Sequence, residues 1–193
     1  MKRTLLAAGF AFAAAAATSA VAAPEKYMLD ASHSQILFSY NHLGYSTTWG
    51  MFSGFEGEIM FDQEDPANSS VSVSMPVKSM WTGWEKRDAH IMSPDFFDAS
   101  DDELVSFTST GIEVTGDTTA LITGDLTVNG VTKSVVLDAQ MNAASEHPMA
   151  KKPWAGFNAT TTLKRTDFDV GNFAPFVGDD VTVQISVEAM KAE

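Results

Sequence analysis

The chain has 193 residues, with 25 Asp and Glu against 12 Lys and Arg, and a formal net charge of −13. This length suits one ordinary domain, and so acidic a chain repels nucleic acid and anionic membrane surfaces, which excludes both as expected partners. The chain has no cysteine, so disulfides, thiolate metal ligands and thiol nucleophiles are excluded together.

The N-terminus has the pattern of a cleavable secretory signal peptide over residues 1–22. Two basic residues precede an apolar, alanine-rich run, and the small residues Ala20 and Ala22 fill the positions of a cleavage site. The run falls short of the roughly 20 apolar residues that a membrane-spanning helix needs. We therefore expect cleavage after Ala22, export from the cytoplasm without stable membrane insertion, and a single mature domain of residues 23–193.

Much of the mature chain alternates apolar and polar residues with a period of two, which predicts strands. The clearest runs are 70–75 and 181–188, and Asn129-Gly130 between β-branched residues predicts a tight primed hairpin. Further strands are expected over 27–29, 35–43, 51–61, 105–114 and 157–163. About eight antiparallel strands result, a number that can close into a barrel with room for one ligand.

The polar face of these strands argues against a barrel embedded in a membrane. Ser70, Ser72 and Ser74 alternate with the apolar residues of one strand, and Thr182 and Gln184 do so in another. A lipid-facing barrel needs an apolar outer band instead. We therefore expect water outside this barrel and apolar side chains inside.

One segment, 80–97, resists the strand pattern because it mixes aromatic and charged residues at helical spacing. It predicts a helical crossing over one mouth of the barrel. Within it, Ser93-Pro94 predicts the N-cap and first-turn proline of a second short helix.

The polar residues do not form a recognisable catalytic or metal-binding pattern. His33, His42, His90 and His147 are scattered without zinc-site spacing, and the nucleophile-elbow, phosphate-loop and dinucleotide-binding motifs do not occur. The sequence thus predicts a binding protein rather than an enzyme, with no cofactor and no metal. Most of these histidines are expected in turns and strands, whereas His42 shares a strand face with Tyr40 and could donate to a ligand oxygen.

Aromatic residues recur in almost every segment, which fits core filling or an apolar interior with aromatic mouths for a long lipid ligand. Arg87 and His90, in the helical segment, are candidates for head-group recognition, with simple surface solvation as the alternative. The residues expected to line the interior or its mouths are Ile36, Phe38, Tyr40, His42, Phe55, Phe61, Trp81, Trp84, Phe97, Phe107, Phe157, Phe173 and Phe176.

Six segments in this order resemble the YceI family of periplasmic polyisoprenoid-binding proteins, over essentially the whole mature chain. They are HSQILFSYNHLGYSTTWGMFSGFEGEIMFD from His33, EKRDAHIMSPDFFDA from Glu85, VSFTST from Val105, ITGDLTVNGVTKSVVL from Ile122, AGFNATTTLKRTDF from Ala155 and VGDDVTVQISVEA from Val177.

The resemblance implies a lipocalin-like, eight-stranded antiparallel barrel in the periplasm. Its hydrophobic tunnel would hold one polyisoprenoid, such as a polyprenyl phosphate, or an isoprenoid quinone tail, in a carrier role without a cofactor. Family members often have Lys-Tyr-Pro where this chain has acidic residues from Asp101 to Glu103, which favours a neutral head group. Two alternatives stay open: a stress-response protein that acts through protein contacts without a lipid, and a homodimeric assembly.

Overall fold

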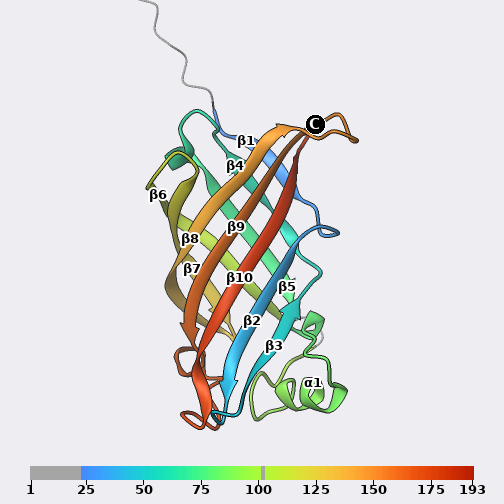
Figure 1. Cartoon of the computed structure of the whole chain (residues 1–193), viewed down its shortest axis with the longest axis vertical. Coiled ribbons are helices and arrows are strands. Elements are labelled where there is room, and N and C mark those ends of the chain that lie inside the picture. Colours follow the sequence, from blue (N-terminus) through green and yellow to red (C-terminus); the bar gives the residue numbers. More distant parts are fainter. Residues whose placement is uncertain (1–22, 101–102) are drawn as a thin grey trace, which may run out of the picture.

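Ten β-strands form one antiparallel sheet that closes on itself to make an elongated barrel (Figure 1). The structure is a computed structural model that describes residues 23–100 and 103–193, so the predicted signal peptide lies outside the described residues. The strands are β1 (Glu25–Leu29), β2 (Gln35–His42), β3 (Ser46–Phe52), β4 (Glu56–Phe61), β5 (Ser70–Pro76), β6 (Leu104–Val114), β7 (Thr119–Val128), β8 (Val131–Glu146), β9 (Pro153–Lys164) and β10 (Val177–Lys191).

The barrel has eight positions around its circumference although it has ten strands. The order β1-β4-β5-β6-β7-β8-β9-β10 closes through pairing of β1 with β10. Strand β2 pairs with a different stretch of β10, and β3 pairs with β2. Strands β1 and β2 therefore share one position in the barrel, like two pieces of one long interrupted strand. Strands β4 and β3 share the next position in the same way. The prediction of a closed, eight-stranded antiparallel barrel is therefore confirmed.

The single strand predicted over residues 51–61 is wrong, because the chain breaks between β3 and β4. Gly54 has φ +69, a left-handed conformation that glycine adopts without strain. Phe52 and Phe55 both line the interior, although residues three apart in an unbroken strand point to opposite faces. The break thus lets two aromatic side chains close together in the chain face inward.

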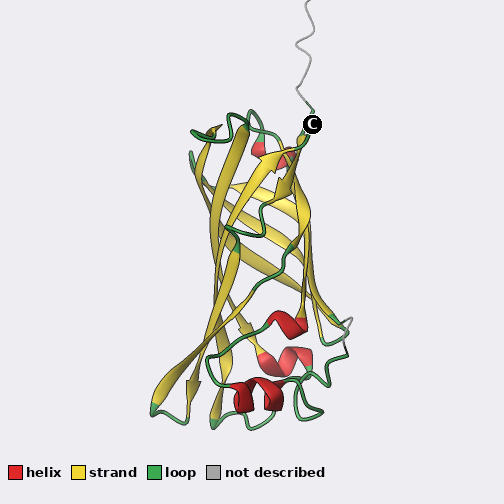
Figure 2. Ribbon diagram, turned by 90° about the vertical axis from the view of Figure 1, so that its right-hand side faces the viewer, coloured by secondary structure: helices red, strands yellow, loops and turns green. Residues whose placement is uncertain are grey.

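The helical segment covers one end of the barrel, but it is shorter than predicted. It contains a single α-helix, α1 (Glu85–Ile91), at the end opposite the C-terminus, and the 3-10 turn Val77–Ser79 precedes it (Figure 2). The second helix predicted at Ser93-Pro94 does not form. Ser93 Oγ instead donates to the carbonyl of His90 at 2.7 Å, so Ser93 belongs to the turn that ends α1. Among the described residues, no helix is long and apolar enough to cross a membrane.

Two clusters of buried apolar side chains pack inside the barrel. The smaller one lies near the C-terminal end, where the Phe61 ring meets those of Tyr27 and Phe157 at 5.8 and 5.5 Å between centroids. The larger one includes Phe107, which belongs to β6, and Phe168, near the opposite end. The space between the inward side chains forms the cavity described below.

The Asn129-Gly130 hairpin is confirmed, with φ +50 and +70 at its two turn residues. We expect Gly130→Val to lower the free energy of unfolding by about 1–2 kcal/mol, because a β-branched residue is strained at positive φ. An added Cβ at Gly130 would meet no atom within 4 Å, so a steric clash is not the cause.

Gly111→Val is the matched control for this hairpin prediction. Gly111 has equally open surroundings but does not have a left-handed φ. Urea unfolding of both variants measures the difference, and equal stability of the two would contradict the role of the turn.

Candidate functional site

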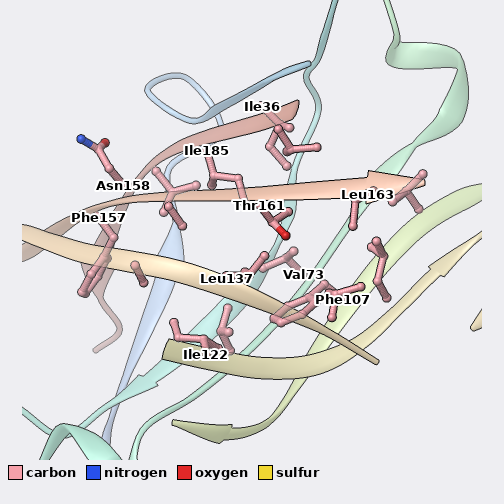
Figure 3. Close-up of a pocket in the computed structure, with 18 of the residues that line it drawn as sticks. Ile36, Val73, Phe107, Ile122, Leu137, Phe157, Asn158, Thr161, Leu163 and Ile185 are labelled. Carbon is pink, nitrogen blue, oxygen red and sulfur yellow. The ribbon is translucent and has the colours of Figure 1, made fainter. Parts of the chain in front are cut away.

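The barrel encloses one continuous apolar cavity of ≈ 370 Å³, which is the candidate site. Alternate residues of the strands supply its wall, because side chains in a strand alternate between the two faces. Val73, Phe107, Ile122, Leu137 and Ile185 come from different strands and point toward a shared space (Figure 3). Such a wall offers contact to an apolar ligand and few hydrogen bonds.

Two glycines help to keep this interior hollow. Phe38 on β2 lies opposite Gly50 on β3, and an added Cβ at Gly50 would collide with the Phe38 ring. Gly124 stands in the same relation to the ring of Phe107. Because glycine has no side chain, each ring can lie against the neighbouring strand instead of projecting across the cavity.

The two ends of the cavity differ in chemistry. At the end near the C-terminus, the wall includes the β6–β7 turn residues 116–118 and residues Pro66 and Ser69 of the β4–β5 connection. At the other end, Met80 and Ile91 of the helical segment line the cavity together with Phe168. The first end offers polar backbone and hydroxyl groups, and the second is closed mainly by apolar side chains.

Eight of the thirteen residues predicted for the interior line this cavity. They are Ile36, Phe38, Tyr40, Phe55, Phe61, Phe97, Phe107 and Phe157. Their contact with a ligand stays a prediction. Alternation therefore identified the inward face of β2 correctly from Ile36 to Tyr40.

Five predicted residues lie outside the cavity wall: His42, Trp81, Trp84, Phe173 and Phe176. His42 is the last residue of β2, and its side chain is exposed at the tip of the barrel. Trp81 follows Met80, which has an extended backbone and faces the cavity, so the next side chain points outward. Phe173 and Phe176 lie on the exposed connection between β9 and β10. The prediction that these five residues line the interior is wrong, although Trp81, Trp84, Phe173 and Phe176 do lie at one end of the barrel, the other place expected for them.

The two head-group candidates, Arg87 and His90, are also absent from the cavity wall. Arg87 donates through Nε to Thr82 Oγ1 at 2.7 Å and through Nη2 to the Thr82 carbonyl at 2.5 Å. His90 Nε2 lies 2.8 Å from Asp95 Oδ2 on the surface. Both side chains hold the helical segment together, and their head-group role has no support from position.

Arg165, which the sequence did not single out, is the basic residue that reaches the cavity wall. Its Nε donates to the Gly178 carbonyl at 2.9 Å, Nη1 to the carbonyls of Val170 and Asn172 at 3.0 and 3.2 Å, and Nη2 to that of Val177 at 2.9 Å. Burial lowers its pKa from the ordinary value. Nothing in the local sequence separates Arg165 from Lys164, because these acceptors come from the far side of a connection.

Three side chains with metal-ligand chemistry gather where β1 turns into β2. Asp30, His33 and Glu188 each place one such atom within 4.8 Å of the others. His33 Nδ1 lies 2.7 Å from Asp30 Oδ2, and Trp154 Nε1 donates to Glu188 Oε2 at 2.8 Å. Since these groups already pair with one another or with neighbours, we interpret the cluster as an ion pair that fastens the turn.

This pair predicts a pH dependence. The hydrogen bond from His33 lowers the pKa of Asp30 to about 2, and the same bond raises the pKa of His33 above 6.5. Asp30 contributes stability above its ordinary pKa of 3.8 and loses it as the pH falls toward 2. His33 contributes stability below pH 6.5 and loses it as the pH rises through its raised pKa.

NMR titration of the His33 ring checks this expectation. Asp30→Asn should bring the pKa of His33 back down toward 6.5, whereas Glu64→Gln, remote from the pair, should leave it raised. A His33 pKa at or below 6.5 in the unmodified protein would show that the pair does not form in solution.

The fold and the cavity together define a class of protein: small closed β-barrels whose interior can enclose one ligand. The family model for the YceI-like domain matches residues 27–189 of this chain. The chain therefore belongs to the YceI-like domain family, which confirms the resemblance noted from the sequence.

Individual relatives agree with this assignment. Protein YceI of Escherichia coli O157:H7 is 38% identical over 191 residues, which cover 99% of each chain. The crystal structure of the Campylobacter jejuni YCEI protein is similar with a TM-score of 0.72 and 30% identity, over 79% of this chain and 90% of that chain. A polyisoprenoid binding domain from Saccharophagus degradans, 15% identical over 86% of this chain and 98% of that one, has the same fold with a TM-score of 0.68.

Proposed function

We propose that the protein binds and carries one long-chain lipid, a polyisoprenoid or the tail of an isoprenoid quinone, inside the barrel. The observation that carries this proposal is the continuous apolar cavity of ≈ 370 Å³. The name of the related polyisoprenoid binding domain supports the same ligand class. An apolar cavity with few polar groups selects a ligand by its chain rather than by its head.

The energetics support tight binding without a dominant polar contact. Burial of one five-carbon isoprene unit contributes on the order of 3 kcal/mol, and ordering of the flexible chain offsets part of the sum over several units. The guanidinium of Arg165 already donates to four backbone carbonyls, and Asp117 at the other end is acidic. These neighbours favour a neutral head group over a strongly anionic one.

A binding role is also preferred to catalysis. General acid–base chemistry needs titratable groups that converge on one reacting atom. In the described part of the cavity wall, the charged residues are Asp117 and Arg165, which lie at opposite ends, and no histidine takes part. This arrangement supports a carrier.

Native mass spectrometry of the protein purified from the cells that make it tests the proposal. We expect one barrel with one retained lipid, and the same spectrum reports whether the protein is a monomer or a homodimer. A protein that is purified empty and takes up neither a polyprenol nor a quinone would contradict the carrier role and favour action through protein contacts.

Secretion is a further part of the proposal, with the periplasm as the compartment. The mature protein should begin at Ala23, because Ala20 and Ala22 fill the small-residue positions of the cleavage site. N-terminal sequencing of the exported protein measures this, and an exported form that begins at Met1 would disprove cleavage.

A further inference from the structure

One end of the barrel exposes a group of large apolar side chains, which we call the aromatic end. Its members are Leu43, Tyr45, Trp81, Trp84, Phe173 and Phe176, with exposed fractions of 48, 91, 60, 57, 55 and 75%. They come from the β2–β3 hairpin, the segment before α1 and the β9–β10 connection, all at the end where α1 lies (Figure 1). Single exposed apolar residues are ordinary on a protein surface, but a group of this size marks an interaction site.

The three parts of the aromatic end contact one another through the backbone and through α1. The amide of Leu43 donates to the carbonyl of Phe176 at 3.0 Å, which joins the hairpin to the β9–β10 connection. The ring of Phe173 lies 6.2 Å from that of His90, on α1, between centroids. The segment with Trp81 pairs with β3 through Met51. The exposed side chains therefore belong to one connected region.

The three segments that carry the exposed apolar side chains contain no charged residue. Residues 31–55, 79–84 and 170–178 contain no Asp, Glu, Lys or Arg, although these four types make up 19% of the chain. Charged residues at this end belong to α1 and the turn after it, where Glu85, Lys86 and Asp95 are exposed.

The aromatic end is continuous with the wall of the cavity. Met80 and Ile91 line the cavity, while Trp81 and Trp84, between them in the chain, face outward. One segment thus separates the apolar interior from the exposed aromatic side chains. A lipid that leaves or enters here would pass from one apolar environment to another over a short distance.

From these observations we propose that the aromatic end docks on the surface of a phospholipid membrane and that lipid passes between the bilayer and the cavity at this contact. This inference rests on the proposed carrier function. Tryptophan and tyrosine are the side chains that membrane–water interfaces favour, because each combines a large apolar ring with a polar group. The absence of charge in the segments that carry these side chains fits a surface of neutral, zwitterionic lipids, and the contact is peripheral and reversible.

Flotation with phosphatidylcholine vesicles tests the docking surface. The mature protein should float with the vesicles, and the double variant Trp84→Ser/Phe176→Ser should bind about tenfold more weakly because it buries less apolar area. Both side chains lie outside the cavity wall and are mostly exposed, so the barrel should fold normally. Met149→Ser is the control, because Met149 is 86% exposed in the β8–β9 turn at the opposite end.

Three results would overturn the docking proposal. One is equal flotation of the double variant and the parent. Another is binding only to vesicles with anionic lipid, which would indicate attraction by charge. The third is a parent that does not float but forms a complex with itself that the double variant loses, which would make this end a protein interface.

Two routes of lipid delivery separate this inference from the carrier function. A polyprenol added from ethanol without vesicles should load the parent and the double variant equally, whereas loading from vesicles should be about tenfold slower in the double variant. Failure of both routes in the parent would reject the carrier function itself. Equal loading of parent and variant by both routes would retain the carrier and reject the docking surface.

Discussion

Replacement of Phe38 by Asp is expected to empty the cavity of lipid or to unfold the barrel. Phe38 is only 8% exposed, lines the cavity and packs its ring 5.5 Å from that of Phe52. A carboxylate at this position finds no basic partner among the neighbours described for Phe38 and loses its hydration. The cost is on the order of 4 kcal/mol, from the lost ring and the buried charge together.

Thr182→Asp is the matched control for the charge. Thr182 lies on β10, the strand next to β2, and is exposed on the outer face. The same carboxylate there remains hydrated, so retained lipid and melting temperature should stay close to those of the parent. Equal losses in the two variants would mean that charge on the sheet, rather than burial in the cavity, causes the effect.

Phe38→Ala separates loss of lipid from loss of fold. The truncation removes packing worth about 3 kcal/mol or more, and part of that packing is proposed to be against the ligand. The variant should therefore lose more stability in the lipid-loaded state than in the lipid-free state. Ser39→Ala, on the opposite face of β2, is the control, and an equal lipid load in both variants and the parent would place the ligand elsewhere.

Arg165→Leu is expected to loosen the end of the barrel that contains α1, with a loss of about 3 kcal/mol in the free energy of unfolding. The substitution leaves the carbonyls of Val170, Asn172, Val177 and Gly178 without their guanidinium donor. These acceptors lie in the connection from β9 to β10 and at the start of β10, both of which line part of the cavity. Urea unfolding and hydrogen exchange of residues 170–178 measure the effect.

Lys164→Leu provides the comparison for Arg165. Lys164 pairs with Asp180 at 2.7 Å on the exposed surface, where water screens the pair, so its loss should destabilise the protein far less than the loss of Arg165. Arg165→Lys should recover only part of the loss, because one ammonium group cannot reproduce the planar set of donors. Equal effects of the Lys164 and Arg165 substitutions would show that the four carbonyl bonds are not important for this connection.

The sequence determined the class of fold and most of the faces of its strands. Alternation with a period of two shows which side chains of a strand share a face. Ile36, Phe38 and Tyr40 were therefore assigned correctly to the interior from alternation alone. The left-handed backbone at Asn129-Gly130 could be predicted because these two neighbouring residue types favour a primed turn by themselves. The order of six segments indicated the family, which the match over residues 27–189 confirmed.

Tertiary structure alone decided where each face ends and how the connections are placed. Alternation gives no position along the barrel axis, so it could not show that β2 leaves the interior between Tyr40 and His42. It also does not apply outside strands, so it could not decide whether Trp81 and Phe176 line the interior or lie exposed at its mouth, as both do. The role of Arg165 depends on four carbonyls brought back to it by the turn from β9 to β10, a contact that no local pattern encodes.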